Sequence, residues 1–174
     1  EIERAVRAPH EISGPDGPIY PGTCRQIPNE EREYRLAKGD AFALRLNMDK
    51  AHEIAGPLYW DESVDNSHLA TPFIFGDVVL ARKDIFASYH LSVSVDDHLQ
   101  GISLVTRGED LRLATHIHRL LQALLDYETP AYRFHPILMD ETGQRYAKRH
   151  MSLTLRQLRE DGFRPIDIRK KIGI

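Results

Sequence analysis

The sequence predicts an α/β domain, a parallel sheet with helices, preceded by a small irregular α+β insertion. An apolar run at Ile102–Val105 is suited to a buried strand, and Glu109–Asp126 follows it with apolar residues at helical spacing. A strand followed by a helix is the building unit of parallel α/β sheets. The composition changes after Gly76, so we expect an insertion over residues 1–75 and a sheet-forming part over residues 76–174.

The insertion is expected to hold few regular elements. Glu1–Ile12 has the apolar spacing of a helix, and it ends before a turn-rich stretch of glycine and proline that continues to about Pro28. Ala41–Met48 alternates apolar and polar residues, which predicts a strand, and Pro57–Trp60 is expected to supply another. We therefore interpret this part of the chain as a small unit with short strands.

The second part of the chain is expected to alternate strands and helices. Asp77–Ala81 and Phe86–Val95 are predicted as two strands. Beyond the central helix, Phe134–Met139 is predicted as the next strand. Ser152–Asp161 is predicted as a helix that its first residue caps and Gly162 ends, because serine favours the N-cap and glycine the C-terminal turn.

Composition and charge limit the classes of partner. The chain carries 23 basic and 26 acidic residues and is 41% hydrophobic, which is enough for one ordinary core but excludes a polybasic nucleic-acid binder. We expect no DNA partner, and any RNA contact must come from a local basic cluster at residues 145–150 or 164–171.

Location and boundaries are also predicted from the sequence. No apolar run is long enough to cross a bilayer, and the single cysteine, Cys24, excludes an internal disulfide, so we expect a cytoplasmic protein. The chain opens with Glu1 rather than methionine. This favours a start partway into a longer gene product.

Three segments carry the chemistry, and they are Tyr89–Gly101, the turn Thr106–Leu111 and the loop Gly143–Arg149. In this order and spacing they resemble the second half of the catalytic domain of glutamyl-type class I aminoacyl-tRNA synthetases, and most closely the short glutamyl-Q branch. The resemblance covers nearly the whole chain. It implies the second half of a Rossmann-like nucleotide-binding domain, preceded by a connective insertion, in an enzyme that activates glutamate with ATP and Mg²⁺.

The loop around Lys148 carries the catalytic prediction. In the family, a mobile loop of the pattern Lys-Met-Ser-Lys-Ser places its second lysine against the phosphates of ATP, where a flexible point charge follows the charge that develops. The matching residues here are Arg145, Tyr146, Ala147, Lys148 and Arg149. The resemblance implies that Lys148 is catalytic and that Lys148 and Arg145 contact ATP, although arginine and alanine replace the first lysine and the serine.

Tyr89 and Arg107 are the second predicted pair. The resemblance implies that the Tyr89 hydroxyl and the Arg107 guanidinium line the glutamate pocket. A carboxylate that leaves water needs a neutralising partner, and arginine offers a bidentate fork that lysine does not. Adenylate formation needs no general base, because the attacking carboxylate is already ionised at neutral pH. Catalysis therefore consists mainly of positioning and charge neutralisation.

A metal site is predicted to be incomplete. Tyr20 and Cys24 resemble the distal half of the zinc site of the glutamyl-Q enzymes, but the upstream Cys-x-Cys pair is absent. Zinc prefers four ligands, so we expect Zn²⁺ in the gene-length protein but little or none in this chain. His116 and His118 lie two residues apart on the predicted helix, which points them to different faces and excludes joint ligation. We expect both to be packed or solvated.

The branch and the completeness of the enzyme remain open. The glutamyl-Q resemblance implies transfer of activated glutamate to queuosine in the anticodon stem-loop of tRNA(Asp). The chain ends soon after Lys148 and leaves no room for the anticodon-binding region of a synthetase, which favours this branch. The alternatives are a catalytic-domain fragment of a discriminating or non-discriminating glutamyl-tRNA synthetase, and a non-catalytic module that binds tRNA or another ligand.

One motif of the family is missing from the sequence. The first half of the family's catalytic domain carries a His-x-Gly-His-like motif at a helix start, where backbone donors and imidazoles contact ATP. No such motif occurs in these 174 residues. We therefore predict that the chain by itself cannot form glutamyl-adenylate.

Overall fold

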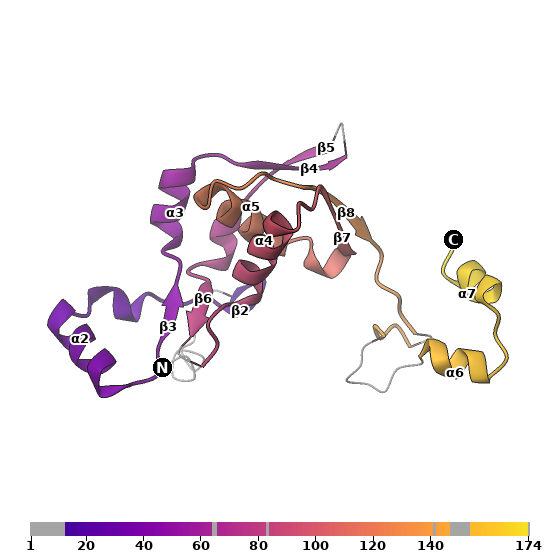
Figure 1. Cartoon of the computed structure of the whole chain (residues 1–174), viewed down its shortest axis with the longest axis horizontal. Coiled ribbons are helices and arrows are strands. Elements are labelled where there is room, and N and C mark those ends of the chain that lie inside the picture. Colours follow the sequence, from indigo (N-terminus) through magenta and orange to yellow (C-terminus); the bar gives the residue numbers. More distant parts are fainter. Residues whose placement is uncertain (1–12, 64–65, 83, 141, 147–153, 174) are drawn as a thin grey trace. The chain divides into compact units, whose positions relative to one another are not determined.

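The computed structural model describes residues 13–63, 66–82, 84–140, 142–146 and 154–173 (Figure 1). Contacts between Cα atoms divide the chain into a first unit that ends at Phe134 and a second unit that begins at His135. The helix predicted over residues 1–12 lies outside the described residues. Within them, no helix is long and apolar enough to cross a membrane.

The first unit begins with short hairpins and helices. Its early elements are β1 (Ser13–Gly14), β2 (Gly17–Pro18), η1 (Thr23–Gln26), α2 (Asn29–Lys38), β3 (Ala43–Arg45), α3 (Met48–Ala55), β4 (Tyr59–Ser63), β5 (Asn66–Leu69) and η2 (Pro72–Phe75). Its later elements are β6 (Val79–Arg82), α4 (Tyr89–Leu99), β7 (Leu104–Gly108), η3 (Glu109–Leu111), α5 (Ala114–Leu124) and β8 (Ala131–His135), of which the last residue belongs to the second unit.

The described strands form four pairs, which are β1–β2, β3–β6, β4–β5 and β7–β8. The first three pairs are antiparallel. In the fourth, β7 and β8 are neighbours and α5 connects them in sequence, which is the strand–helix–strand unit that the sequence predicts. The mixed α/β class is therefore confirmed. The boundary expected near residue 75 stays a prediction, and β3 pairs with β6 across it.

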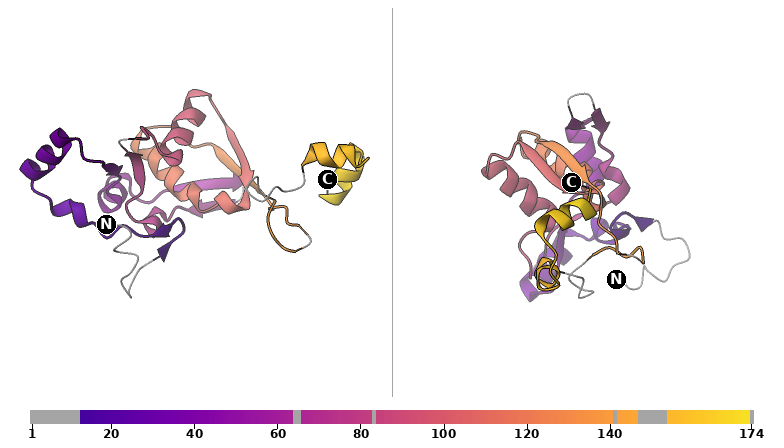
Figure 2. Two further views of the ribbon diagram at one scale, coloured as in Figure 1. Left: turned by 90° about the horizontal axis from the view of Figure 1, so that it is seen from below. Right: turned by 90° about the vertical axis from the view of Figure 1, so that its right-hand side faces the viewer.

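The core of the first unit gathers around α5, which is buried on most of its surface. Ile117 and Leu120 are fully buried there, and they belong to one cluster with Trp60 of β4 and Tyr132 of β8. α4 packs beside α5 (Figures 1 and 2). Burial of these large apolar side chains is the main favourable term for this unit.

The strand predicted over Phe86–Val95 is wrong, because its residues from Tyr89 onward form the first part of α4. Ser88 is its N-cap, and the Ser88 hydroxyl accepts a hydrogen bond from the Leu91 amide at 3.3 Å. The alternation of apolar residues and two β-branched valines favours a strand locally. The serine cap and packing on α5 outweigh this preference.

Other boundaries shift by a few residues. Only Ala43–Arg45 of the predicted strand over Ala41–Met48 is extended, because Asn47 caps a helix that starts at Met48. The strand predicted over Phe134–Met139 begins earlier, at Ala131.

The second unit contains α6 (Leu155–Glu160) and α7 (Pro165–Lys171). Thr154 caps α6, since its hydroxyl accepts a hydrogen bond from the Gln157 amide at 3.1 Å. The predicted cap, Ser152, lies outside the described residues. Gly162 has a φ of +86°, which glycine adopts without strain and which fits its predicted place at the end of the helix.

Candidate functional site

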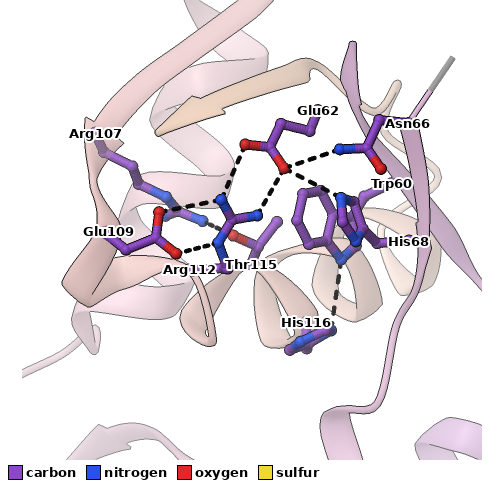
Figure 3. Close-up of polar contacts among 9 residues, drawn as sticks. All are labelled: Trp60, Glu62, Asn66, His68, Arg107, Glu109, Arg112, Thr115 and His116. Atoms are coloured by element: carbon purple, nitrogen blue, oxygen red, sulfur yellow. Dashed lines mark hydrogen bonds and ion pairs between the residues drawn. The ribbon is translucent and has the colours of Figure 1, made fainter. Parts of the chain in front are cut away.

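Arg107 lies in β7 and is held from several sides. Its side chain is 8% exposed, and its Nη1 donates a hydrogen bond to His118 Nδ1 at 2.9 Å. Its Nη2 donates to the hydroxyl of Thr115, a contact that Figure 3 shows. The guanidinium also lies over the rings of Tyr132 and Phe134, at 5.1 and 5.7 Å from their centroids. The predicted pocket residue is thus part of the core.

The charge of Arg107 has no hydrogen-bonded carboxylate among the described residues, since the groups that accept from it are a ring nitrogen of His118 and the hydroxyls of Thr115 and Tyr89. Burial lowers the pKa of Arg107, while attraction to Tyr132, Tyr89 and Asp97 acts in the opposite direction. Its Nε–H is buried and has no hydrogen-bond partner. Arginine stays protonated in proteins, so this arrangement leaves a buried positive charge that Asp97 attracts but to which no carboxylate of the described residues is hydrogen-bonded.

Tyr89 begins α4 and is close to Arg107. Its ring centroid is 5.6 Å from that of His118, and its hydrogen bond with Arg107 partly offsets the lowering of the Arg107 pKa that burial causes. Tyr89 is about half exposed and lines a cavity of about 240 Å³. The other lining residues are Pro15, Asp16, Phe75, His90, Asp110, Leu111, Leu113 and Ala114. Arg107 is not among the residues that line this cavity, and it contacts two groups connected to the lining, Tyr89 and His118.

Two histidines connect the cavity wall to Arg107. His90 of α4 lines the cavity, and its Nδ1 lies 3.1 Å from His118 Nε2. On its other side, His90 Nε2 lies 3.3 Å from Asp16 Oδ2, at the tip of the β1–β2 hairpin. Burial, then Arg107 and then His90 lower the pKa of His118 to about 2, so its ring is neutral at physiological pH.

A second polar cluster supports the start of α5 (Figure 3). Glu62 of β4 accepts hydrogen bonds from Arg112 Nη1 and Nη2 at 2.7 and 2.9 Å, and the Arg112 guanidinium lies 4.2 Å from the Phe134 ring centroid. Hydrogen bonding from Arg112 lowers the pKa of Glu62. His116 accepts hydrogen bonds from Trp60 Nε1 at 3.5 Å and the Thr71 amide at 3.1 Å. These contacts hold the β4–β5 hairpin against the helix that carries His118.

The loop of Tyr20 and Cys24 has internal contacts that differ from those of a metal site. The Tyr20 hydroxyl accepts a hydrogen bond from the Cys24 amide at 2.7 Å, and the Arg45 guanidinium lies 4.4 Å from the Tyr20 ring centroid. No group of three or more His, Cys, Asp or Glu side chains could hold a metal ion within the described ranges. Tyr20 and Cys24 alone do not fit zinc, which prefers four ligands. The prediction of little zinc remains a prediction.

The predicted ATP-binding loop belongs to the second unit. Arg145 is exposed and forms an antiparallel bridge with Met139. Lys148, the predicted catalytic residue, lies outside the described residues. The structure therefore brings Tyr89 and Arg107 together, and the functional roles of Tyr89, Arg107, Arg145 and Lys148 stay predictions.

Sequence reasoning missed the functional interest of His90 and His118. It excluded joint metal ligation by His116 and His118 and assigned His118 no partner, whereas the structure buries His118. However, His118 of α5 contacts Arg107 of β7. The spacing of His116 and His118 within one helix does not indicate a contact with a separate strand. The available signal was a histidine on a helix predicted to pack against the core, because burying an imidazole costs free energy unless it is hydrogen-bonded.

Comparison with known proteins identifies relatives over the whole chain. The family described as tRNA synthetases class I (E and Q), catalytic domain, matches residues 1–173. A glutamyl-Q tRNA(Asp) synthetase from Rhodobacter capsulatus is 43% identical over 186 residues, which cover 100% of this chain and 64% of the relative. A glutamate–tRNA ligase from Coprothermobacter proteolyticus is 33% identical over 146 residues, covering 84% of this chain and 31% of the relative.

A solved structure has the same fold. The crystal structure of a glutamate tRNA ligase from Elizabethkingia meningosepticum in complex with its amino acid aligns with a TM-score of 0.58 at 20% identity. The alignment covers 83% of this chain and 28% of that one. This chain thus spans less than two thirds of each of these relatives.

Proposed function

Because this chain belongs to the family of class I tRNA synthetase (E and Q) catalytic domains, we propose that its gene-length protein activates glutamate with ATP and transfers it to queuosine in the anticodon of tRNA(Asp). The greater identity to the glutamyl-Q enzyme than to the glutamate–tRNA ligase supports this branch. We place the activity in the cytoplasm, where its substrates ATP and tRNA meet.

Arg107 is the observation that carries the glutamate part of the proposal. A buried charge is costly unless it is paired, yet the described hydrogen-bond partners of this guanidinium are neutral, Asp97 acts on it only by attraction, and its Nε–H has no hydrogen-bond partner. A carboxylate ligand would supply the missing anion and accept the unpaired N–H. Tyr89, which lines the adjacent cavity, would offer that ligand a phenolic hydroxyl.

The proposed reaction needs charge neutralisation more than acid–base chemistry. An oxygen of the glutamate α-carboxylate attacks the α-phosphorus of ATP, and an O–P bond forms while the bond to the leaving pyrophosphate breaks. We assign the side-chain carboxylate of glutamate to Arg107 and Tyr89. We assign the phosphates to Lys148 and Arg145, whose positive charges oppose the charge that develops on the leaving group.

The test is transfer of labelled glutamate to tRNA by the gene-length protein, followed by nuclease mapping of the label. Label in the anticodon loop supports the queuosine-modifying function, and pyrophosphate exchange without tRNA is expected alongside it. Label at the 3′ end would instead support the second candidate, a glutamate–tRNA ligase, which the 33% identical relative favours. If the protein catalyses no pyrophosphate exchange and transfers no label, both enzymatic functions are overturned. The non-catalytic binding module would then be the function that is left.

Two variants test the residue assignments. Arg107→Gln is expected to lower kcat/KM for glutamate by on the order of a hundredfold, because a charge-assisted hydrogen bond is lost. Arg133→Gln is the matched control, since Arg133 is an exposed arginine on the adjacent strand β8. Lys148→Ala should abolish pyrophosphate exchange while glutamate binding persists. Equal activity of Arg107→Gln and the control would contradict the pocket assignment.

A further inference from the structure

The chain of contacts from Arg107 to Asp16 allows only one direction of hydrogen bonding. Arginine has five N–H donors and no acceptor, so the Nη1 of Arg107 must donate and His118 Nδ1 must accept. A ring nitrogen that accepts carries no proton. The single proton of the neutral His118 ring is therefore on Nε2, which faces His90 Nδ1 at 3.1 Å.

The same reasoning fixes the next ring. Because His118 Nε2 donates, His90 Nδ1 must accept, and the proton of His90 is on Nε2. That nitrogen faces Asp16 Oδ2 at 3.3 Å, and a carboxylate accepts. The contacts thus form a relay in which Arg107 donates to His118, His118 to His90, and His90 to Asp16. We call these four residues the histidine relay.

The histidine relay has a charge at each end and neutral rings between them. Arg107 is buried at the inner end, whereas Asp16 is largely exposed at the outer end. An aspartate or glutamate at the position of His118 would pair with Arg107 and neutralise it. A neutral acceptor fixes the orientation of the guanidinium and leaves its charge for a ligand.

We propose that His118, supported by His90 and Asp16, is a positioning residue that holds Arg107 in one orientation for the side-chain carboxylate of glutamate. This inference rests on the proposed function, since it assumes that the site takes glutamate. It adds a determinant of selectivity, because an oriented, unneutralised guanidinium favours the anionic glutamate over its neutral amide, glutamine. The low pKa of His118 is consistent with a ring that accepts from a cation.

The first test reads the protonation pattern directly. Long-range ¹H–¹⁵N spectra of the gene-length protein, labelled on histidine nitrogens, distinguish the two tautomers of each ring. We expect both His118 and His90 to carry their proton on Nε2 at pH 7. A proton on Nδ1 of either ring, or a doubly protonated ring, would overturn the relay.

The second test measures selectivity with variants of His118. Glutamine can accept from Arg107 through its carbonyl oxygen and donate to His90 through its amide, so His118→Gln should keep the wild-type KM for glutamate. His118→Leu breaks the relay and should raise that KM by on the order of tenfold, with KM for ATP unchanged. It should also reduce the preference for glutamate over glutamine.

His116→Leu is the control for a merely structural effect. His116 is buried two residues before His118 and has other partners, Trp60 and Thr71. This variant should lose stability without a change in KM for glutamate. If His118→Leu does not fold, His90→Leu breaks the relay one step further from Arg107 and should raise the same KM by a smaller factor.

The outcomes separate the inference from the proposed function. If the wild-type protein does not activate glutamate but both rings carry their proton on Nε2, the proposed function fails and only the geometry of the relay survives. If the wild-type protein activates glutamate and His118→Leu keeps its KM and its selectivity, the positioning role is wrong although the function stands.

Discussion

Asp77 and Arg25 connect the loop of Tyr20 and Cys24 to the first helix of the core. Arg25 Nη2 lies 2.6 Å from Asp77 Oδ1, and the same oxygen accepts a hydrogen bond from the Met48 amide at 3.0 Å. Asp77 is only 6% exposed. One carboxylate therefore anchors the loop and also satisfies the first amide of α3, which has no partner within the helix.

Asp77→Ala is expected to destabilise the chain. Because the hydrogen bond from Met48 to the carboxylate is lost, the free energy of unfolding should fall by about 2 kcal/mol. Urea unfolding followed by circular dichroism measures the change. Asp61→Ala is the control, since Asp61 is an exposed aspartate in β4. A loss no larger than that of the control would contradict the anchoring role.

Zinc is expected to have little effect on the loop. Tyr20 and Cys24 offer two ligands, and the Arg25–Asp77 ion pair already fixes the adjoining segment. Chelation by EDTA should leave the midpoint of thermal unfolding unchanged, and elemental analysis after dialysis should find zinc far below a 1:1 ratio. Zinc retained at 1:1 would show that additional ligands complete the site.

Glu62 is expected to stabilise the fold above its pKa and to lose that effect in acid. Hydrogen bonding from Arg112 lowers its pKa below the ordinary 4.5, so the unfolded chain takes up the proton first as the pH falls. At pH 7, Glu62→Gln should cost about 1 kcal/mol or less, since both partners are partly exposed. The difference should shrink as the pH falls below 4.5. A constant difference would contradict the assigned pKa direction.

His118 is expected to make the free energy of unfolding depend on pH over a higher pH range than Glu62 does. Its pKa is about 2 in the folded chain and 6.5 ordinarily, so below pH 6.5 only the unfolded chain binds this proton. Stability should therefore fall with pH, by up to about 1.4 kcal/mol per pH unit from this residue.

His118→Gln removes the titrating group and should flatten the curve of unfolding free energy between pH 6.5 and 5. The pKa of His116 is also lowered, chiefly by burial, but His116 is present in both proteins and its effect cancels in the comparison. If the curves of the wild-type protein and of His118→Gln were parallel over this pH range, His118 would be protonated in the folded state as well.

Local patterns predicted several elements well. The apolar spacing before residue 126 predicted α5, because a helix that faces a core repeats its apolar residues every three or four positions. Where two local signals conflicted, the prediction failed. Leu91, Val93 and Val95 alternate as in a strand, yet the Ser88 cap and packing on α5 make the segment helical.

The sequence by itself determined the α/β class, through local periodicity, and the family, through three segments that resemble it, while the roles of Tyr89 and Arg107 in a glutamate pocket stay predictions. Only the tertiary structure decided what surrounds Arg107. The contacts of His118 with Arg107 and His90, and of Arg25 with Asp77, join elements that are separate in the sequence. Such contacts depend on how helices and strands pack, and hydrogen-bond donors and acceptors that meet in this way leave no local pattern in the chain.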